Sequence, residues 1–241
     1  MREHVVTDHL AERITYARKA KRTAFAIFMG ALLLAALSPS WWPVSFLFGF
    51  PALIAGMRIS DDYCTYEDGW DGEMLFRQRL AGLALPDSWT AWYGVPAGRN
   101  AKGKIIDTDC ILLGPGGLFA FEVKHYTGFT VCADGRWERL KVGRMGTPYR
   151  GRIGSPSGQL AHNLMSLKEW IEGTGGKAPW IQGYVVFTNG RGRLHAQAMR
   201  HLKAIEVDLL AEVIPQGSKI LDDEALAALA DAVRTYCGRP V

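Results

Sequence analysis

The chain has 241 residues, of which 48% are hydrophobic and 22% are charged, and its formal net charge is +4. These proportions are typical of folded proteins and exclude wholesale disorder. The four cysteines, at positions 64, 110, 132 and 237, form no C-x-x-C motif and no Cys/His pairs at zinc spacing, which speaks against a disulfide scaffold and a structural zinc site.

A stretch without charged side chains, residues 23–57, follows a basic segment, residues 1–22, in which we expect a short amphipathic helix. As one straight helix the stretch would be about 52 Å long at ~1.5 Å per residue, whereas the hydrocarbon core of a bilayer is roughly 30 Å thick. Pro39 and Pro43 also oppose a single helix. We therefore predict a transmembrane helical hairpin over 23–57, with its turn at residues 38–43.

Basic residues flank the uncharged stretch on both sides. Because basic flanks favour the cytoplasm, a hairpin keeps the rest of the chain on the cytoplasmic side of the cell (inner) membrane, with membrane lipid as a partner. Two alternatives remain open: a buried helical hairpin in a soluble protein, and a single span that puts the C-terminal part outside. The flanking basic residues are Arg18, Lys19, Lys21, Arg22 and Arg58.

After a polar linker, residues 58–69, the pattern is that of a soluble α/β domain. Apolar residues at 75, 76, 80 and 83 have helical spacing. Short apolar runs bounded by glycine, asparagine and proline indicate strands. The expected helices cover residues 72–83, 157–173 and 222–236, and the expected strands cover residues 89–95, 105–113, 118–124, 129–132, 137–140, 183–188 and 204–209.

Three charged residues stand in apolar strands on either side of a Gly-Pro-Gly-Gly turn, residues 114–117. Glu122 and Lys124 are two residues apart on one strand, so their side chains share a face, and the turn brings Asp109 of the preceding strand towards them. Carboxylates in such surroundings are costly unless they are paired or bind a cation, and their oxygens are ligands that Mg²⁺ prefers. The pattern indicates a phosphodiester-cleaving site, although an edge hairpin with a surface salt bridge explains the same spacing.

The order of motifs from residue 70 to about residue 190 resembles the NERD (nuclease-related) domain, a family similar to the PD-(D/E)xK nucleases. The resemblance implies a restriction-endonuclease-like αβββαβ core with a central mixed sheet over 70–190, preceded by the membrane hairpin and followed by a C-terminal extension, 191–241. The motifs that carry it are Gly72-Glu73 opening a helix, Asp109, the turn 114–117, Glu122-Val-Lys124 with Gly128, Trp137, and Gln159 on a helix.

The resemblance also implies a role for each matching residue. Asp109 and Glu122 would hold a Mg²⁺ or Mn²⁺ ion, and Lys124 would be the catalytic lysine. Glu73 would be an auxiliary acid from the first helix. Gln159 would be a polar contact from the helix that follows the sheet.

The chain departs from the family at one position. The residue before the metal-binding aspartate is commonly isoleucine in the family, whereas here it is Thr108. The alternation of a strand puts Asp107 on the same face as Asp109. Asp107 is therefore a rival or additional metal ligand.

Residues 136–153 form a basic region. It has a local charge that suits a phosphate backbone, with aromatic residues among the basic ones. A solvated loop, or contact with anionic lipid headgroups, explains the same charge. The candidate nucleic-acid-binding residues are Arg136, Arg139, Lys141, Arg144, Arg150 and Arg152.

Together these features predict a membrane-anchored, cytoplasm-facing, metal-dependent nuclease of the NERD type, acting on nucleic acid and on DNA in preference to RNA. The alternative is a catalytically inactive nuclease-fold module that binds nucleic acid or protein. Such a module would be a membrane component of a larger assembly, or of a homo-oligomer.

Overall fold

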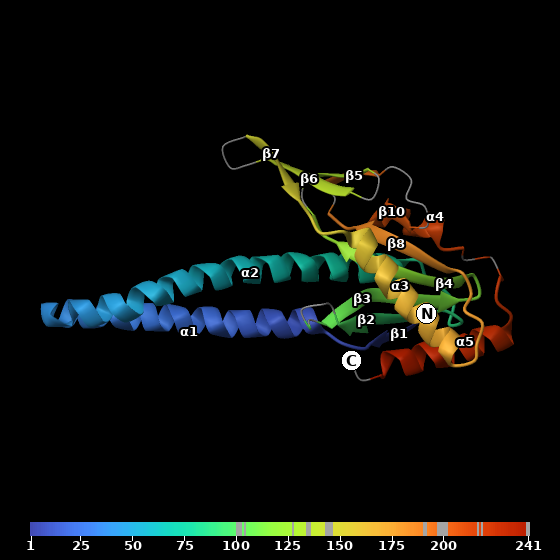
Figure 1. Ribbon diagram of the computed structural model, residues 1–241, viewed down its shortest axis with the longest axis horizontal. Coiled ribbons are helices and arrows are strands. Elements are labelled where there is room, and N and C mark those ends of the chain that lie inside the picture. The colour runs from blue at the N-terminus through green and yellow to red at the C-terminus, as the bar shows by residue number, and fades with distance from the viewer. Residues whose placement is uncertain are drawn as a thin grey trace. The chain divides into compact units, whose positions relative to one another are not determined.

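The computed structural model divides the chain into two compact units, whose elements are labelled in Figure 1. We call Met1–Thr7 together with Gly72–Val241 the sheet domain, and Asp8–Asp71 the helical hairpin. The hairpin is thus inserted after the first seven residues of the sheet domain. The structure describes residues 1–99, 103, 105–126, 128–133, 136–142, 147–189, 192–196, 202–215, 217 and 219–239.

Two long helices make up the hairpin, with the break between them where the prolines predict it. α1 covers His9–Leu37, a short 3₁₀ helix η1 covers Pro39–Trp41, and α2 covers Trp42–Gly82. α1 begins at His9 because the Asp8 side chain caps it, accepting a hydrogen bond from the backbone N–H of Ala11 at 3.2 Å.

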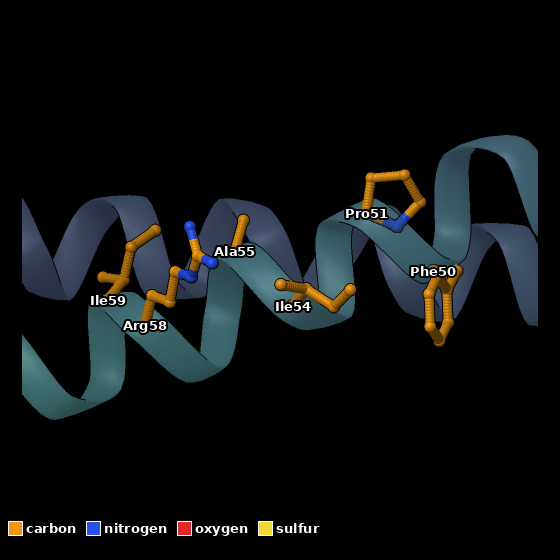
Figure 2. A pocket seen from close by; sticks show the side chains of 6 residues that line it. All are labelled: Phe50, Pro51, Ile54, Ala55, Arg58 and Ile59. Carbon is orange, nitrogen blue, oxygen red and sulfur yellow. The ribbon is translucent and has the colours of Figure 1, made fainter.

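α2 continues past a further proline in its interior, Pro51 (Figure 2). Proline has no backbone N–H, so one bond of the helical ladder is missing at this point. The helix therefore tolerates a local defect on an otherwise apolar stretch.

Small residues line the contact between α1 and α2. Ala17, Ala24 and Ala31 are buried and lie seven residues apart, a heptad spacing. A Cβ added at Gly49 would lie 3.0 Å from Cβ of Ala31, and one added at Gly56 would lie 3.6 Å from Cβ of Ala24. The helices are thus antiparallel and close, and small-residue contacts of this kind are common between membrane helices.

The outward faces of both helices carry large apolar side chains. By length and composition both helices are able to cross a membrane, which suggests membrane association. Only 11% of the most apolar window of α1, and 17% of that of α2, is buried, whereas a core helix of a soluble protein is mostly buried. Exposed apolar residues include Phe25, Leu33, Leu37, Phe46, Leu47 and Met57.

Six described strands form the central mixed sheet of the sheet domain. β2, β3 and β4 are antiparallel neighbours, β1 is parallel to β2, and β8 is parallel to both β4 and β10. Their spatial order is β1 (Arg2–Val5), β2 (Thr90–Arg99), β3 (Ile105–Gly114), β4 (Gly117–Lys124), β8 (Ile181–Phe187) and β10 (Leu202–Glu206).

Helices cover both faces of this sheet. α3 (Pro156–Gly173) and α5 (Asp223–Cys237) pack on the face that carries Ile111 and Leu113. The last turns of α2 pack on the opposite face, with η2 (Val207–Leu209) and α4 (Leu210–Val213). Taken in chain order, the end of α2, then β2, β3, β4, α3 and β8 make the αβββαβ core, which confirms the predicted fold.

A second sheet of four described strands is interleaved with the first along the chain: β5, β6 and β7 come between β4 and β8, and β9 comes between β8 and β10. Its outer strands β7 and β9 are joined to the central pair by antiparallel and parallel pairing respectively. The order is β7 (Pro148–Arg152), β6 (Arg136–Val142), β5 (Gly128–Ala133) and β9 (Gly192–Ala196).

The structure differs from the sequence-based expectation at several short or polar segments. Residues 2–5 are a strand rather than part of an amphipathic helix, and they pair with Thr90–Tyr93 of β2. Residues 58–69, expected as a linker, are helical within α2, and residues 207–209 are a 3₁₀ helix rather than a strand. β7 and β9 were not predicted. The three strands among these segments have no apolar repeat, so pairing with neighbouring strands decides their structure.

Gly114, at the end of β3, is a glycine whose replacement we expect to disturb the sheet. A Cβ at Gly114 would lie 2.1 Å from Cδ2 of Trp89, a fully buried side chain. Gly114→Ala should therefore lower the free energy of unfolding by about 3 kcal/mol, measured by urea unfolding of the full chain in detergent. Gly82→Ala is the control, because a Cβ there meets open space. Equal unfolding midpoints for the two variants would contradict the packing described here.

Candidate functional site

The candidate site is built on the β3–β4 hairpin. The two strands pair from Gly114↔Gly117 to Cys110↔Phe121, and one further step places Asp109 opposite Glu122. The backbone N–H of Val123 donates a hydrogen bond of 2.5 Å to Oδ2 of Asp109. The turn thus sets a register in which both carboxylates lie at the same end of the hairpin.

These side chains point to the face of the sheet that α3 covers. Ile111 of β3 and Ala120 of β4 belong to the core on that face, and side chains two residues further along each strand lie on the same face. Asp109, Glu122 and Lys124 are therefore brought together, as the sequence predicts. Asp107 shares their face of β3.

Glu122 is the most deeply buried member of the site, with 1% of its surface exposed. Nζ of Lys124 donates a hydrogen bond to its Oε1. Its Oε2 is buried and has no hydrogen-bond partner among the described residues. One buried carboxylate oxygen is thus left without the partner that buried polar atoms normally have.

Burial and like charge act on both acids. Burial raises the pKa of Glu122, against the nearby positive charge of Lys124. Burial also raises the pKa of Asp109, and the charges of Glu122 and Glu73 raise it further. Burial alone would lower the pKa of Lys124, but the two carboxylates beside it outweigh burial and raise it. The arrangement is an acidic cluster with one cation, which a second cation would stabilise.

Glu73 of α2 is brought near this cluster because the residue before it, Gly72, packs closely against His125 and Thr188. A Cβ at Gly72 would lie 2.6 Å from Cβ of His125 and 2.9 Å from Oγ1 of Thr188, so only glycine lets the helix approach the end of β4. Glu73 forms an ion pair of 3.6 Å with Arg77. Its negative charge contributes to the raised pKa of Asp109.

α3 contributes two polar residues on its sheet-facing side. Nδ2 of Asn163 donates a hydrogen bond of 2.9 Å to the backbone carbonyl of Asp107, and Asn163 is buried. Gln159 lies one turn earlier, so it shares this side of the helix, and it is half-buried. Asn163 was not predicted. The signal for it was present, because it interrupts the apolar positions Leu160 and Leu167 of the buried helix face.

The donor set suits a hard divalent cation. Mg²⁺ is usually bound through one or two carboxylates and keeps several waters, and Asp109 with Glu122 supplies two. The unpartnered Oε2 of Glu122 fits such an ion, because a cation would satisfy it. Among the described residues no three His, Cys, Asp or Glu side chains converge closely enough to make an all-protein metal cage. Asp109 and Glu122 are accordingly the residues that would hold Mg²⁺ or Mn²⁺, with Asp107 beside them.

Comparison with known proteins identifies the domain. A family model described as "Nuclease-related domain", NERD, matches residues 68–188. The chain belongs to the NERD family. The match includes α2 from residue 68, the core strands β2, β3, β4 and β8, and α3.

The chain was also compared with curated proteins and with solved structures. "Probable kinase PglW" of Streptomyces coelicolor is 26% identical to this chain over 135 residues, which are 55% of this chain. The match spans 8% of the length of that protein. No solved structure matches the chain significantly.

Basic residues of this NERD domain lie on β6 and β7, two adjacent antiparallel strands of the second sheet. Arg139 lies over the ring of Tyr126, with its guanidinium carbon 5.1 Å from the ring centre. Arg150 forms an exposed ion pair of 3.5 Å with Glu138. Arg136 is exposed at the start of β6. The side chains of Lys141 and Arg152, and the whole of Arg144, lie outside the described residues.

Replacing only one partner of the buried ion pair Lys124–Glu122 should lower the free energy of unfolding more than replacing both partners. Lys124→Met leaves the buried Glu122 without its cation and should lower the free energy of unfolding by about 2 kcal/mol or more. Adding Glu122→Gln should restore over half of that loss, so a double-mutant cycle should give a coupling energy of about 1–2 kcal/mol.

The exposed pair Lys168 and Glu172 on α3, 3.7 Å apart, is the control for this cycle. Its coupling energy should be about 0.5 kcal/mol or less, because solvent screens it. Unfolding of the full chain in detergent measures both cycles. Similar coupling energies for the two pairs would contradict the burial of the site pair.

Proposed function

We propose that this NERD protein is a membrane-anchored nuclease that faces the cytoplasm and hydrolyses phosphodiester bonds of nucleic acid, with DNA as the preferred substrate. The observation that carries the proposal is the convergence of Asp109, Glu122 and Lys124 at one end of the β3–β4 hairpin. Apolar strands place two acids and a lysine together at a cost in stability, which is typical of functional sites.

Each residue has a role that follows from its position. Asp109 and Glu122 bind Mg²⁺ or Mn²⁺, and such an ion, when bound, makes a coordinated water more acidic and neutralises charge on a phosphoryl oxygen. Lys124, whose ammonium group lies beside both acids, donates hydrogen bonds to a phosphate oxygen. Glu73 from α2 and Gln159 from α3 orient groups around the scissile phosphate. Asp107 is an additional acid on the same face.

The second sheet supplies the contact with the nucleic-acid backbone in this proposal. Arg136, Arg139 and Arg150 are three described basic residues on adjacent strands that follow β4 along the chain. Contacts to phosphate oxygens by arginine do not depend on sequence, so the protein would bind nucleic acid without strong sequence preference.

The strand pairing of β1 supports a two-span anchor rather than a single span. Arg2–Val5 precedes the hairpin and Thr90–Tyr93 follows it, yet the two segments are hydrogen-bonded neighbours in one sheet. If the hairpin crosses the membrane, it crosses an even number of times. Arg18, Lys19, Lys21 and Arg22 at the domain end of α1 favour the cytoplasm for that end.

Activity of the full chain, purified in detergent, tests the nuclease proposal. We expect cleavage of DNA in the presence of Mg²⁺, and a rate lower by about a hundredfold or more in Glu122→Gln, Asp109→Asn and Lys124→Met. Asp208→Asn should keep the wild-type rate, because Asp208 is exposed and pairs only with Arg79 among the described residues.

Cleavage that persists in all three site variants would contradict the assignment of the site. A wild-type chain that binds DNA in a salt-sensitive way, but does not hydrolyse it whichever divalent metal is added, would contradict the proposed enzymatic activity. It would leave the inactive binding module as the function.

Cysteine labelling tests the two-span anchor. Cys64 of α2 is exposed and forms no disulfide. A membrane-impermeant maleimide should label it only from the cytoplasmic side. In a chain with Cys64→Ser, the substitution Ser40→Cys at the turn should be labelled only from the opposite side, and the Cys64→Ser chain alone is the control. Labelling of both positions from one side would contradict a hairpin that crosses the membrane.

A further inference from the structure

The helical hairpin contains a crevice of about 590 Å³ between α1 and α2. Its lining changes in character along its length. Three basic residues, Arg18, Lys21 and Arg22, stand at the end that continues into the sheet domain, and apolar residues such as Phe25, Phe28 and Leu53 line the remainder. Arg18 and Phe28 are ten residues apart on α1, so the crevice runs for about 15 Å along the helix.

The basic end has three positive charges and one acid nearby, Glu67, which reaches Arg18 through Tyr63. Arg18 donates a hydrogen bond of 3.3 Å to the hydroxyl of Tyr63, and Nζ of Lys21 lies 5.5 Å from the centre of the same ring. Tyr63 itself donates to Glu67. Within the described part of the chain, no carboxylate forms an ion pair with Arg18, Lys21 or Arg22, so most of their N–H groups are available to an anion.

The apolar end is open rather than packed. Phe25 and Met57, which line it from the two helices, are 64% and 60% exposed. Water is a poor partner for these surfaces, and an anion alone would leave them uncovered. The crevice therefore suits a ligand with a phosphate at one end and a hydrocarbon chain at the other.

We propose that the crevice binds one anionic phospholipid from the leaflet on the side of the sheet domain. Its phosphate contacts Arg18, Lys21 and Arg22, and one acyl chain lies along Phe25, Phe28 and Leu53. The inference depends on the proposed membrane insertion of the hairpin, because only insertion puts the crevice at the level of lipid headgroups. It is independent of the nuclease site.

The opposite side of α2 offers a matched control. Arg58 carries the same charge at a similar level of the hairpin, but it lines a separate hollow with Phe50, Pro51 and Ile54 (Figure 2). Ala55 belongs to that hollow, whereas Ala52 belongs to the crevice. Each kind of substitution can thus be made inside and outside the proposed site.

The test places the full chain in nanodiscs of equal parts phosphatidylglycerol and phosphatidylcholine, transfers it to detergent, and counts retained lipids by native mass spectrometry. We expect one retained phosphatidylglycerol in preference to phosphatidylcholine. Arg22→Gln should lower its affinity about fivefold, as expected for one charge at an anionic surface, while Arg58→Gln should not. Ala52→Trp should abolish retention by filling the crevice, and Ala55→Trp should not.

Three results would overturn the inference. These are equal retention of the two lipids, equal losses in Arg22→Gln and Arg58→Gln, and full retention in Ala52→Trp. Alkaline extraction of membranes separates this failure from that of the anchor. Release of the wild-type chain by alkali would contradict insertion, whereas a chain that stays in the membrane without retaining phosphatidylglycerol would contradict only the lipid site.

Discussion

The register of the β3–β4 hairpin is the constraint on which the site depends. A slip of one residue would turn Asp109 to the other face of the sheet and leave Glu122 opposite Thr108 or Cys110 in place of an acid. The tight turn between Gly114 and Gly117 fixes the register at one end. The hydrogen bond from the backbone of Val123 to Asp109 holds the other end. The apolar residues between them make the slipped pairing costly.

The register of the hairpin buries Glu122, and this burial is the main loss of folding stability that the register brings. The α3 face of the sheet is apolar, and the register places a carboxylate among residues that gain stability only from exclusion of water. Lys124 compensates one oxygen of Glu122, and the other remains without a partner among the described residues. A protein selected for stability alone would place an apolar residue there. A bound cation would satisfy this oxygen, which is why we propose that Glu122 binds a metal ion.

The hairpin is inserted between β1 and the rest of the sheet domain, so the chain passes between the two units twice, once at residues 7–8 and once at residues 71–72. β1 is short and exposed, and it is held by its pairing with β2 and by the hydrogen bond of 2.6 Å from Thr7 to the carbonyl of Gly94. A fragment that begins after the hairpin would lack this edge strand and would expose β2. The full chain is accordingly the appropriate material for functional measurements.

The sequence predicted the elements that have a strong repeat or a strong break. The hairpin turn followed from its prolines, β3 and β4 from apolar runs around a glycine-rich turn, and the last turns of α2 from helical spacing of apolar residues. Asp109, Glu122 and Lys124 converge as the strand alternation requires. β1, β7 and β9 could not be predicted, because they are short and polar, and β1 and β9 also depend on partners far away in the sequence. The buried depth of Glu122 and the contact of Asn163 with Asp107 depend on how α3 packs, which spacing alone does not define.

Titration of the full chain with Mn²⁺, followed by electron paramagnetic resonance, tests the central claim most directly. We expect one tightly bound Mn²⁺ per chain, and affinity at least tenfold lower in Glu122→Gln and in Asp109→Asn but unchanged in Asp208→Asn. Binding of Mn²⁺ with equal affinity by all four proteins would contradict the account.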